Sequence, residues 1–444
     1  MTWSGSCWPG ARAAGRRARR AVPVPAAPAA LAALAALALT AAGTLGPAAA
    51  AVADPAGSTP SSTTTAQSCD AVDTSGSGTP AALPVVSGTP WSLDRFPLGQ
   101  LHALAQGKGV TVAVIDTGVA AGNAQLTGAV LPGKDEISGD SAPTTTDPVG
   151  HGTEVAGIIA ARPVAGTGFT GIAPEAKILS IRASDSSGDG NSSVLAKAVE
   201  DAVAAHAQVV NISQDVQENG TPVAQSPSSP LGRAVADAVA HDVVVVAAAG
   251  NEGLDEKTYP AAFPGVLAVG ASDYNDERAS FSEEGDFVGV AAPGVDMVTT
   301  WPGGGQCSTQ GTSFAAPYVA GVAALIRQLH PDWTARQVIT RIEQSAQRPG
   351  SGRDPYIGWG VVDPVAAVSD SSVPGDAPTP DPSARAVAQP VPVRPFYTGE
   401  SPDQRDQRLA TYVLSAGLVL TLLITGGAVV LRDAGRRRKG TGTT

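Results

Sequence analysis

The chain has 444 residues, of which 43% are hydrophobic and 16% charged, and its formal net charge is −11. Five arginines precede residue 54, and the residues after Leu431 have a net charge of +4, so residues 54–431 carry −20. An acidic segment of this size argues against a nucleic acid or an anionic membrane surface as a partner. The length allows roughly one large domain or two to three small ones.

Residues 1–53 have the composition of a secretory signal peptide. Arginines between Arg12 and Arg20 precede an Ala/Leu-rich run, and an A-x-A pattern at 51–53 lies directly before Asp54. Basic, apolar and small residues in this order direct export and are then removed. The alternative is a first transmembrane helix that stays in place.

A second apolar run, Leu409–Leu431, contains no charged residue. At about 1.5 Å per residue it is long enough to cross roughly 30 Å of hydrocarbon. Basic residues follow at once and favour a cytoplasmic tail at 432–444, which leaves residues 54–408 outside the membrane. A buried core helix is the alternative interpretation.

The cysteines favour one disulfide and no metal centre. Cys7 lies in the predicted signal peptide, so Cys69 and Cys307 remain in the exported chain, where pairing is the default. The alternative is a free Cys69 that pairs with another chain. No His/Cys cluster has the spacing of metal ligands, and we expect neither a metal nor a cofactor.

Three segments lie between the two apolar ends. Residues 54–99 begin with a Ser/Thr/Gly/Pro-rich stretch that cannot fold alone. Apolar anchors follow in this segment: Trp91, Leu93 and Phe96. We therefore expect an extension that wraps a larger domain rather than a folded inhibitory domain. Residues 100–370 form the globular domain, and the Pro-rich residues 371–408 read as a linker.

Within the globular domain, short β-branched runs alternate with Ala-rich stretches. The expected strands are Val110–Ile115, Lys177–Arg182, Gln208–Ser213, Val243–Ala249 and Gly265–Ala271. The expected helices include Ser192–Ala207 and Leu231–Asp242. Because the strands are continuously apolar, both faces of the sheet should be covered. Alternating strands and helices predict an α/β domain with a mostly parallel sheet.

Three residues with ionisable or nucleophilic side chains lie where a strand is followed by a helix. Asp116 follows the first strand, His151 begins HGTEVAG with glycines on both sides, and Ser313 lies in GTSFAAPYVAG at the start of a helix. Singly, each has a plainer explanation as a turn, surface or capping residue. Together they place a carboxylate, an imidazole and a hydroxyl at the sheet edge where active groups gather.

A fourth candidate is Asn251, which follows the buried strand of VVVVAAAGNEG. A side-chain amide at this position can donate a hydrogen bond to an oxyanion as it develops. An ordinary turn asparagine is the alternative. We also expect Thr153 to cap the helix that begins near His151.

The segments IDTG, HGTEVAG, AAAGNEG and GTSFAAPYVAG together resemble the motifs of subtilisin-like serine proteases, in the chain order Asp, His, Ser. The resemblance spans about residues 100–370 and implies a mostly parallel central sheet flanked by helices. It implies Ser313 as nucleophile, His151 as general base and then acid, and Asp116 as the residue that orients it. Asn251 and the Ser313 N–H would form the oxyanion hole.

The wider organisation is similar to the mycosins, the membrane-anchored subtilisin-like proteases of type VII secretion systems in actinobacteria. The similarity rests on the two apolar ends, on the lead-in PWSLDRFPLGQLHALAQGKG and on HPDWTARQVITRIEQSAQ near the domain end. It implies a protease outside the cell membrane that acts on secreted proteins or peptides and is associated with the secretion complex. The rival hypothesis is a scaffold that stabilises this complex, with catalysis secondary.

One segment departs from the family pattern. NISQDVQEN, residues 211–219, has Gln214 where subtilisins usually have leucine, and it lacks the glycine that follows. Because this segment usually lines the cleft, backbone pairing with the substrate should differ here, and the sequence supplies no side-chain preference.

Overall fold

A computed structural model describes residues 66–69, 80–137, 143–185, 189–218, 221–382 and 400–439. The predicted signal peptide and most of the Ser/Thr-rich part of the extension lie outside these residues, as do positions 383–399 of the predicted linker.

The domain is built on a seven-stranded sheet in the order β10-β9-β8-β5-β1-β3-β2, with every neighbouring pair parallel. The strands are β1 Thr111–Asp116, β2 Val130–Asp135, β3 Lys177–Arg182, β5 Val209–Ile212, β8 Val244–Ala248, β9 Leu267–Ser272 and β10 Val288–Pro293. The predicted α/β fold and its five predicted strands are confirmed. The sheet gains two further strands, β2 and β10, at its edges.

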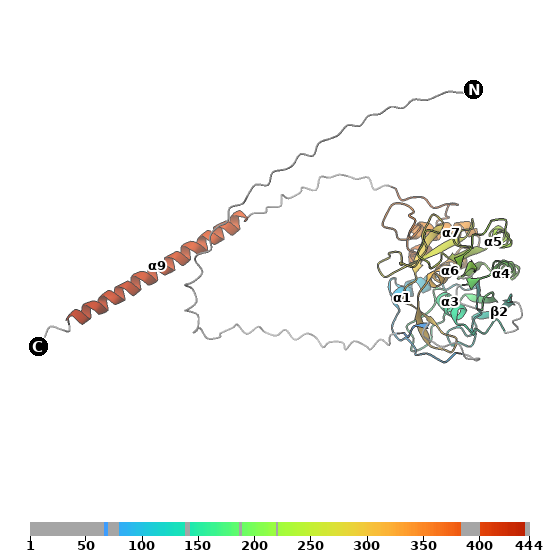
Figure 1. Cartoon of the computed structure of the whole chain (residues 1–444), viewed down its shortest axis with the longest axis horizontal. Helices are drawn as coiled ribbons and strands as arrows, with labels where there is room; N and C mark the ends of the chain where they lie inside the picture. Colours follow the sequence, from blue (N-terminus) through green and yellow to red (C-terminus); the bar gives the residue numbers. More distant parts are fainter. Residues whose placement is uncertain are drawn as a thin grey trace, which may run out of the picture. The chain divides into compact units, whose positions relative to one another are not determined.

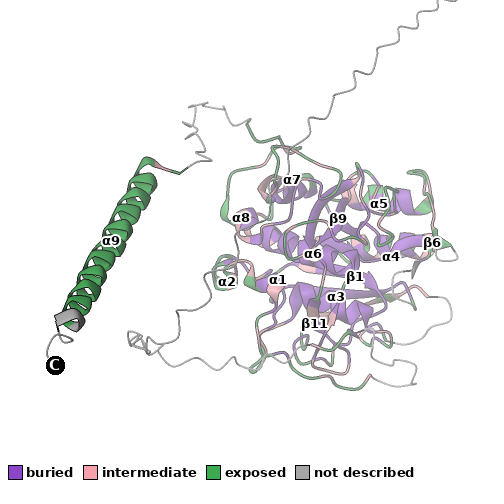
Figure 2. Cartoon of the chain, turned by 60° about the vertical axis from the view of Figure 1, so that its left-hand side comes forward, coloured by how far each residue is buried: buried purple, intermediate pink, exposed green. Residues whose placement is uncertain are grey.

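Helices cover both faces of the sheet (Figure 2). On one face lie α3, His151–Ala160, and α6, Thr312–Leu329. The other face is covered by α4, Ser192–Ala204, and α5, Pro230–Ala240. In β1, Val112 and Val114 enter the first core, whereas Ala113 and Ile115 enter the second. A strand buried on both sides has no polar face, which explains its continuously apolar sequence.

Shorter elements complete the domain. Helix α7, Ala335–Ser345, begins with a capping box formed by Thr334 and Gln337. It is joined by α1 Trp91–Asp94, α2 Leu98–Leu104, α8 Pro364–Ser369, a hairpin of β11 Met297–Thr300 and β12 Gln306–Thr309, and a small sheet of β4 Asp189–Gly190, β6 Asp215–Glu218 and β7 Thr221–Pro222.

The extension lies against the β11–β12 hairpin. The backbone N–H of Leu83 donates to the carbonyl of Gly304 at 2.9 Å, and the Val86 N–H donates to the Gln306 side chain at 2.8 Å. Further upstream, Cys69 and Cys307 form a disulfide with their Cα atoms 5.0 Å apart. The described part of the extension therefore follows the protease domain instead of folding by itself.

The apolar anchors of the extension are buried to different degrees. Leu93 is only 3% exposed and belongs to the main core, whereas Phe96 is half-buried against that core. Trp91 is also half-buried, and its indole N–H donates to the carbonyl of Val295 at 2.9 Å. Of the three, Leu93 therefore contributes most to docking.

The final helix, α9, runs from Pro402 to Lys439 (Figure 1). It is exposed wherever its side chains are described (Figure 2). It is the one helix of the described residues long and apolar enough to cross a membrane, by length and composition. The helix begins before the predicted apolar run Leu409–Leu431 and continues into the basic residues after it.

The disulfide closes a loop of 238 residues, so breaking it should destabilise the protein. We expect Cys69→Ser to lower the free energy of unfolding by about 2–5 kcal/mol, because the unfolded chain regains entropy. Thermal unfolding of the full chain with and without reductant measures this. A linked Cys69–Cys307 peptide should appear in mass spectra of the unreduced protein, and two alkylatable thiols there would contradict the prediction.

Candidate active site

Asp116 ends the central strand β1, between β3 and β5, and its side chain is fully buried. Carboxyl ends of parallel strands meet at one edge of the sheet, which is where the loops that carry functional groups converge. The backbone N–H of Thr117 donates to Asp116 Oδ1 at 2.8 Å. This bond fixes the carboxylate next to the first turn of α3.

His151 is the first residue of α3 and pairs with Asp116 across the sheet edge. The distance from His151 Nδ1 to Asp116 Oδ1 is 2.7 Å, and both side chains are buried. Gly150 precedes the histidine with φ +112°, and a Cβ there would come within 2.8 Å of the Trp301 ring. Only glycine fits this turn, because the backbone angle and the close approach both exclude a side chain.

Asp147 was not singled out by the sequence, yet it organises the turn before α3. Its Oδ1 accepts from the Thr117 hydroxyl at 2.9 Å and the Gly150 N–H at 2.8 Å, and its Oδ2 accepts from the Thr153 N–H at 2.8 Å. The expected capping role of Thr153 is therefore wrong: it lies inside the helix, and Asp147 accepts its hydrogen bonds. An acidic residue just before a helix start was the available signal.

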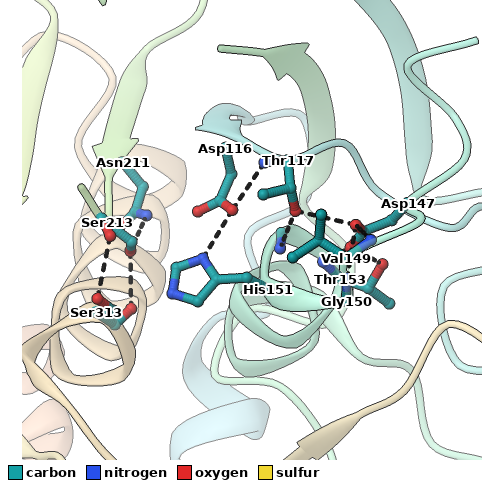
Figure 3. Close-up of polar contacts among 11 residues, drawn as sticks. Asp116, Thr117, Asp147, Val149, Gly150, His151, Thr153, Asn211, Ser213 and Ser313 are labelled. Carbon is teal, nitrogen blue, oxygen red and sulfur yellow. Dashed lines mark hydrogen bonds and ion pairs between the residues drawn. The ribbon is translucent and has the colours of Figure 1, made fainter. Parts of the chain in front are cut away.

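Ser313 is the second residue of α6. Its hydroxyl donates to the carbonyl of Ser213 at 3.0 Å, while the Ser213 hydroxyl donates to the carbonyl of Ser313 at 2.7 Å. The amide of Asn211 in turn donates to the Ser213 hydroxyl at 2.9 Å. In the view of Figure 3 the His151 ring lies between Asp116 and Ser313. The His151 ring also lies beside the ring of Phe314, the residue after Ser313, with the ring centroids 5.3 Å apart. The starts of α3 and α6 are therefore close, while the hydroxyl of Ser313 is bonded to a backbone carbonyl.

Asn251 lies in the loop after β8 and is oriented by the start of α6. Its Oδ1 accepts hydrogen bonds from the Thr312 N–H at 2.8 Å and from the Thr312 hydroxyl at 3.0 Å. The side chain is exposed, and its NH₂ group has no hydrogen-bond partner among the described residues. Because the oxygen is fixed by Thr312, the amide donors are left available to a ligand.

Charge around His151 raises the pKa of its imidazole. Burial is the largest single effect and lowers this pKa, but the charge of Asp116, its hydrogen bond to the ring, and the charges of Glu154 and Asp147 together outweigh burial. The pKa rises from 6.5 to about 9. The ion pair with Asp116 therefore stabilises the folded state below pH 6.5, and this contribution is lost as the pH rises through about 9.

The segment after β5 forms its own small strand, β6. It pairs in parallel with β4 at Asp189–Gly190 and antiparallel with β7. Gln214, just before β6, is 1% exposed, and its amide has no hydrogen-bond partner among the described residues. The segment that departs from the family motif in sequence is therefore a short strand preceded by a buried amide without a partner among the described residues.

A parallel sheet with an Asp–His pair and a serine at its carboxyl edge is the arrangement of a subtilisin-like serine endopeptidase. The family model of the subtilase family matches residues 107–360, and the chain belongs to this family. The resemblance stated from the motifs is confirmed.

Relatives place the chain more closely. It is 39% identical over 369 residues to Mycosin-4 of Mycobacterium tuberculosis, which covers 73% of this chain and 78% of that protein. Subtilisin Savinase of Lederbergia lenta is 38% identical over 282 residues, covering 63% of this chain and 98% of that protein. The crystal structure of MycP1 from the ESX-1 type VII secretion system superposes with a TM-score of 0.60 at 33% identity, covering 68% of this chain and 91% of that one. The chain is thus a mycosin-like serine endopeptidase.

The raised pKa of His151 can be measured directly. In NMR spectra of the full chain with labelled histidine rings, we expect the His151 ring to titrate near pH 9. Asp116→Asn should lower this midpoint, because it removes the largest favourable charge and leaves the effect of burial. Asp237→Asn, beside the exposed His241, is the control and should leave the titration midpoint of His151 unchanged. An unchanged midpoint in Asp116→Asn would contradict the assignment.

Proposed function

We propose that this protein hydrolyses peptide bonds through a triad of Asp116, His151 and Ser313, with Asn251 as an oxyanion donor. The observation that carries the proposal is the buried 2.7 Å contact between His151 and Asp116, at the carboxyl ends of the strands, with Ser313 in the first turn of α6. The carboxylate holds the Nδ1–H of the imidazole and leaves Nε2 for proton transfer.

The reaction begins when Ser313 Oγ leaves its bond to the Ser213 carbonyl and attacks the substrate carbonyl carbon. His151 Nε2 accepts the hydroxyl proton and later gives it to the leaving amine. Asp116 stabilises the imidazolium that forms between these two steps. Water then attacks the acyl-enzyme with the same base and releases the second product.

The tetrahedral intermediate carries an oxyanion, which needs donors placed in advance. The NH₂ group of Asn251 is available because Thr312 holds its carbonyl oxygen. The Ser313 N–H is also available, since the first N–H groups of a helix have no intrahelical acceptor. Loss of one such donor typically costs about 10²–10³ in rate.

General base catalysis requires a neutral imidazole. Since the pKa of His151 is about 9, kcat/KM of the free enzyme should increase with pH through that value.

The nucleophile can be tested with a fluorophosphonate probe on the full chain. Ser313→Ala should abolish labelling, because it removes the attacking oxygen, and Asn251→Ala should slow it by about 10²–10³. Ser308→Ala, on the nearby hairpin strand β12, is the matched control and should label normally. Labelling that persists in Ser313→Ala would point to another nucleophile.

We further propose a membrane-anchored domain order for the protein. Residues 1–53 are a signal peptide, 54–99 the extension, 100–370 the protease domain, 371–408 the linker, 409–431 the membrane span and 432–444 the cytoplasmic tail. The length and composition of α9 support the anchor. The protease domain then acts outside the cytoplasmic membrane on secreted proteins or peptides.

A second candidate role is stabilisation of a type VII secretion complex. It is supported by likeness to MycP1, whose structure is described as that of an essential component of the ESX-1 system, with 35% identity and a TM-score of 0.58. Secretion in a deletion strain complemented with Ser313→Ala separates the two roles. If catalysis is the role, secretion fails as it does in the deletion strain; restored secretion would favour the scaffold.

A further inference from the structure

The loop that carries Asn251 is held by Glu283. The Glu283 N–H donates to the carbonyl of Gly250 at 3.1 Å, and the Leu254 N–H donates to Glu283 Oε2 at 2.6 Å. The next residue, Glu284, donates its N–H to the carbonyl of Leu254 at 3.0 Å. Glu283 thus contacts both ends of the loop with its own backbone and side chain.

A second carboxyl group, that of Glu252, lies close to both Asn251 and Glu283. Glu252 Oε2 accepts the backbone N–H of Asn251 at 3.0 Å. The two acidic side chains converge behind Gly250, where an added Cβ would meet Glu283 Cγ at 2.6 Å and Glu252 Oε2 at 3.3 Å. Glu283 is 1% exposed, and its Oε1 receives no N–H or O–H donor from the described residues. Two carboxyl groups can share a hydrogen bond only when one of them carries a proton.

We propose that Glu283 is a positioning residue for the oxyanion donor: its protonated carboxyl group donates to Glu252, accepts from the Leu254 N–H, and so fixes the loop that orients Asn251. This inference rests on the proposed function. When Glu283 loses its proton, two negative charges face each other behind the loop, and the donor geometry is lost.

Within the part of the chain that the structure describes, no ion pair joins a cation to either carboxyl group. The cations of this region are engaged elsewhere: Arg278 pairs with Glu284 at 2.9 Å and Lys257 with Asp286 at 3.2 Å. Another charged residue of this loop, Asp255, is acidic and lies near Gly285. Burial first, and then Glu252, raise the pKa of Glu283 to about 8, against the lowering effect of the Leu254 N–H.

A proton fits this pair better than a metal ion. Calcium takes six to eight oxygen ligands and usually several carboxylates. Among the described residues, no group of three or more His, Cys, Asp or Glu side chains placed for a metal includes Glu252 or Glu283.

The test is Glu283→Gln in the full chain, with fluorophosphonate labelling rates measured from pH 6 to 10. Glutamine keeps one donor and one acceptor but cannot ionise. As the pH passes 8, the parent should lose rate because Glu283 ionises, whereas the variant should not. We therefore expect the ratio of the variant's rate to the parent's rate to increase about tenfold, which is less than the rate lost when an oxyanion donor is removed. His151 titrates in both proteins, so its effect cancels in the ratio.

Glu284→Gln is the matched control, and its ratio should stay constant with pH. A constant ratio for Glu283→Gln, or an equal increase for Glu284→Gln, would overturn the proposal. The proposed function would survive this result, because labelling of the parent would still depend on Ser313. If EDTA slows the parent but not Glu283→Gln, a metal ion occupies the pair and the proton-sharing model is wrong. Failure of the proposed function would give a different result from failure of the Glu283 proposal, because labelling would then persist in Ser313→Ala.

Discussion

The buried carboxylate of Asp147 is the constraint on which the geometry of the site depends. It binds the Thr117 hydroxyl just after β1 and the first N–H groups of α3, so the end of the strand and the start of the helix are joined at one residue. The helix that carries His151 is thereby placed against the strand that carries Asp116. An imidazole on a freely rotating loop would lose that contact.

The same arrangement concentrates negative charge around one imidazole. Asp116, Asp147 and Glu154 all raise the pKa of His151, against the effect of burial. A base with a high pKa is strong once neutral, but it is protonated over more of the pH range. The imidazole of His151 is therefore a stronger base when neutral, but a smaller fraction of it is neutral at pH 7. The apolar parallel sheet supplies the rigid frame that holds these charged groups together.

Local sequence predicted the interior strands and the four site residues because each has a short-range signal. Interior strands are continuously apolar, and the site residues lie in glycine-framed turns at strand ends. The edge strand β2 carries no such signal: its sequence, VLPGKD, is partly exposed and contains proline and glycine, which suit a sheet edge.

Contacts made only by tertiary structure were beyond sequence reasoning. Ser213 and Ser313 bond across 100 residues, and Glu283 reaches the Asn251 loop because β8 and β9 are adjacent in the sheet. The Cys69–Cys307 disulfide could be predicted only from the number of cysteines, because two remain after the predicted signal peptide.

That bond also determines what a proteolytic nick can do to the molecule. Cys69 and Cys307 enclose the segment that contains Asp116, His151 and Asn251. A single cut anywhere between residues 70 and 306 opens the ring but releases neither fragment, because the two pieces remain covalently joined. The protease can thus be cleaved within this segment, by itself or by another enzyme, and still migrate as one species until a reductant separates the parts.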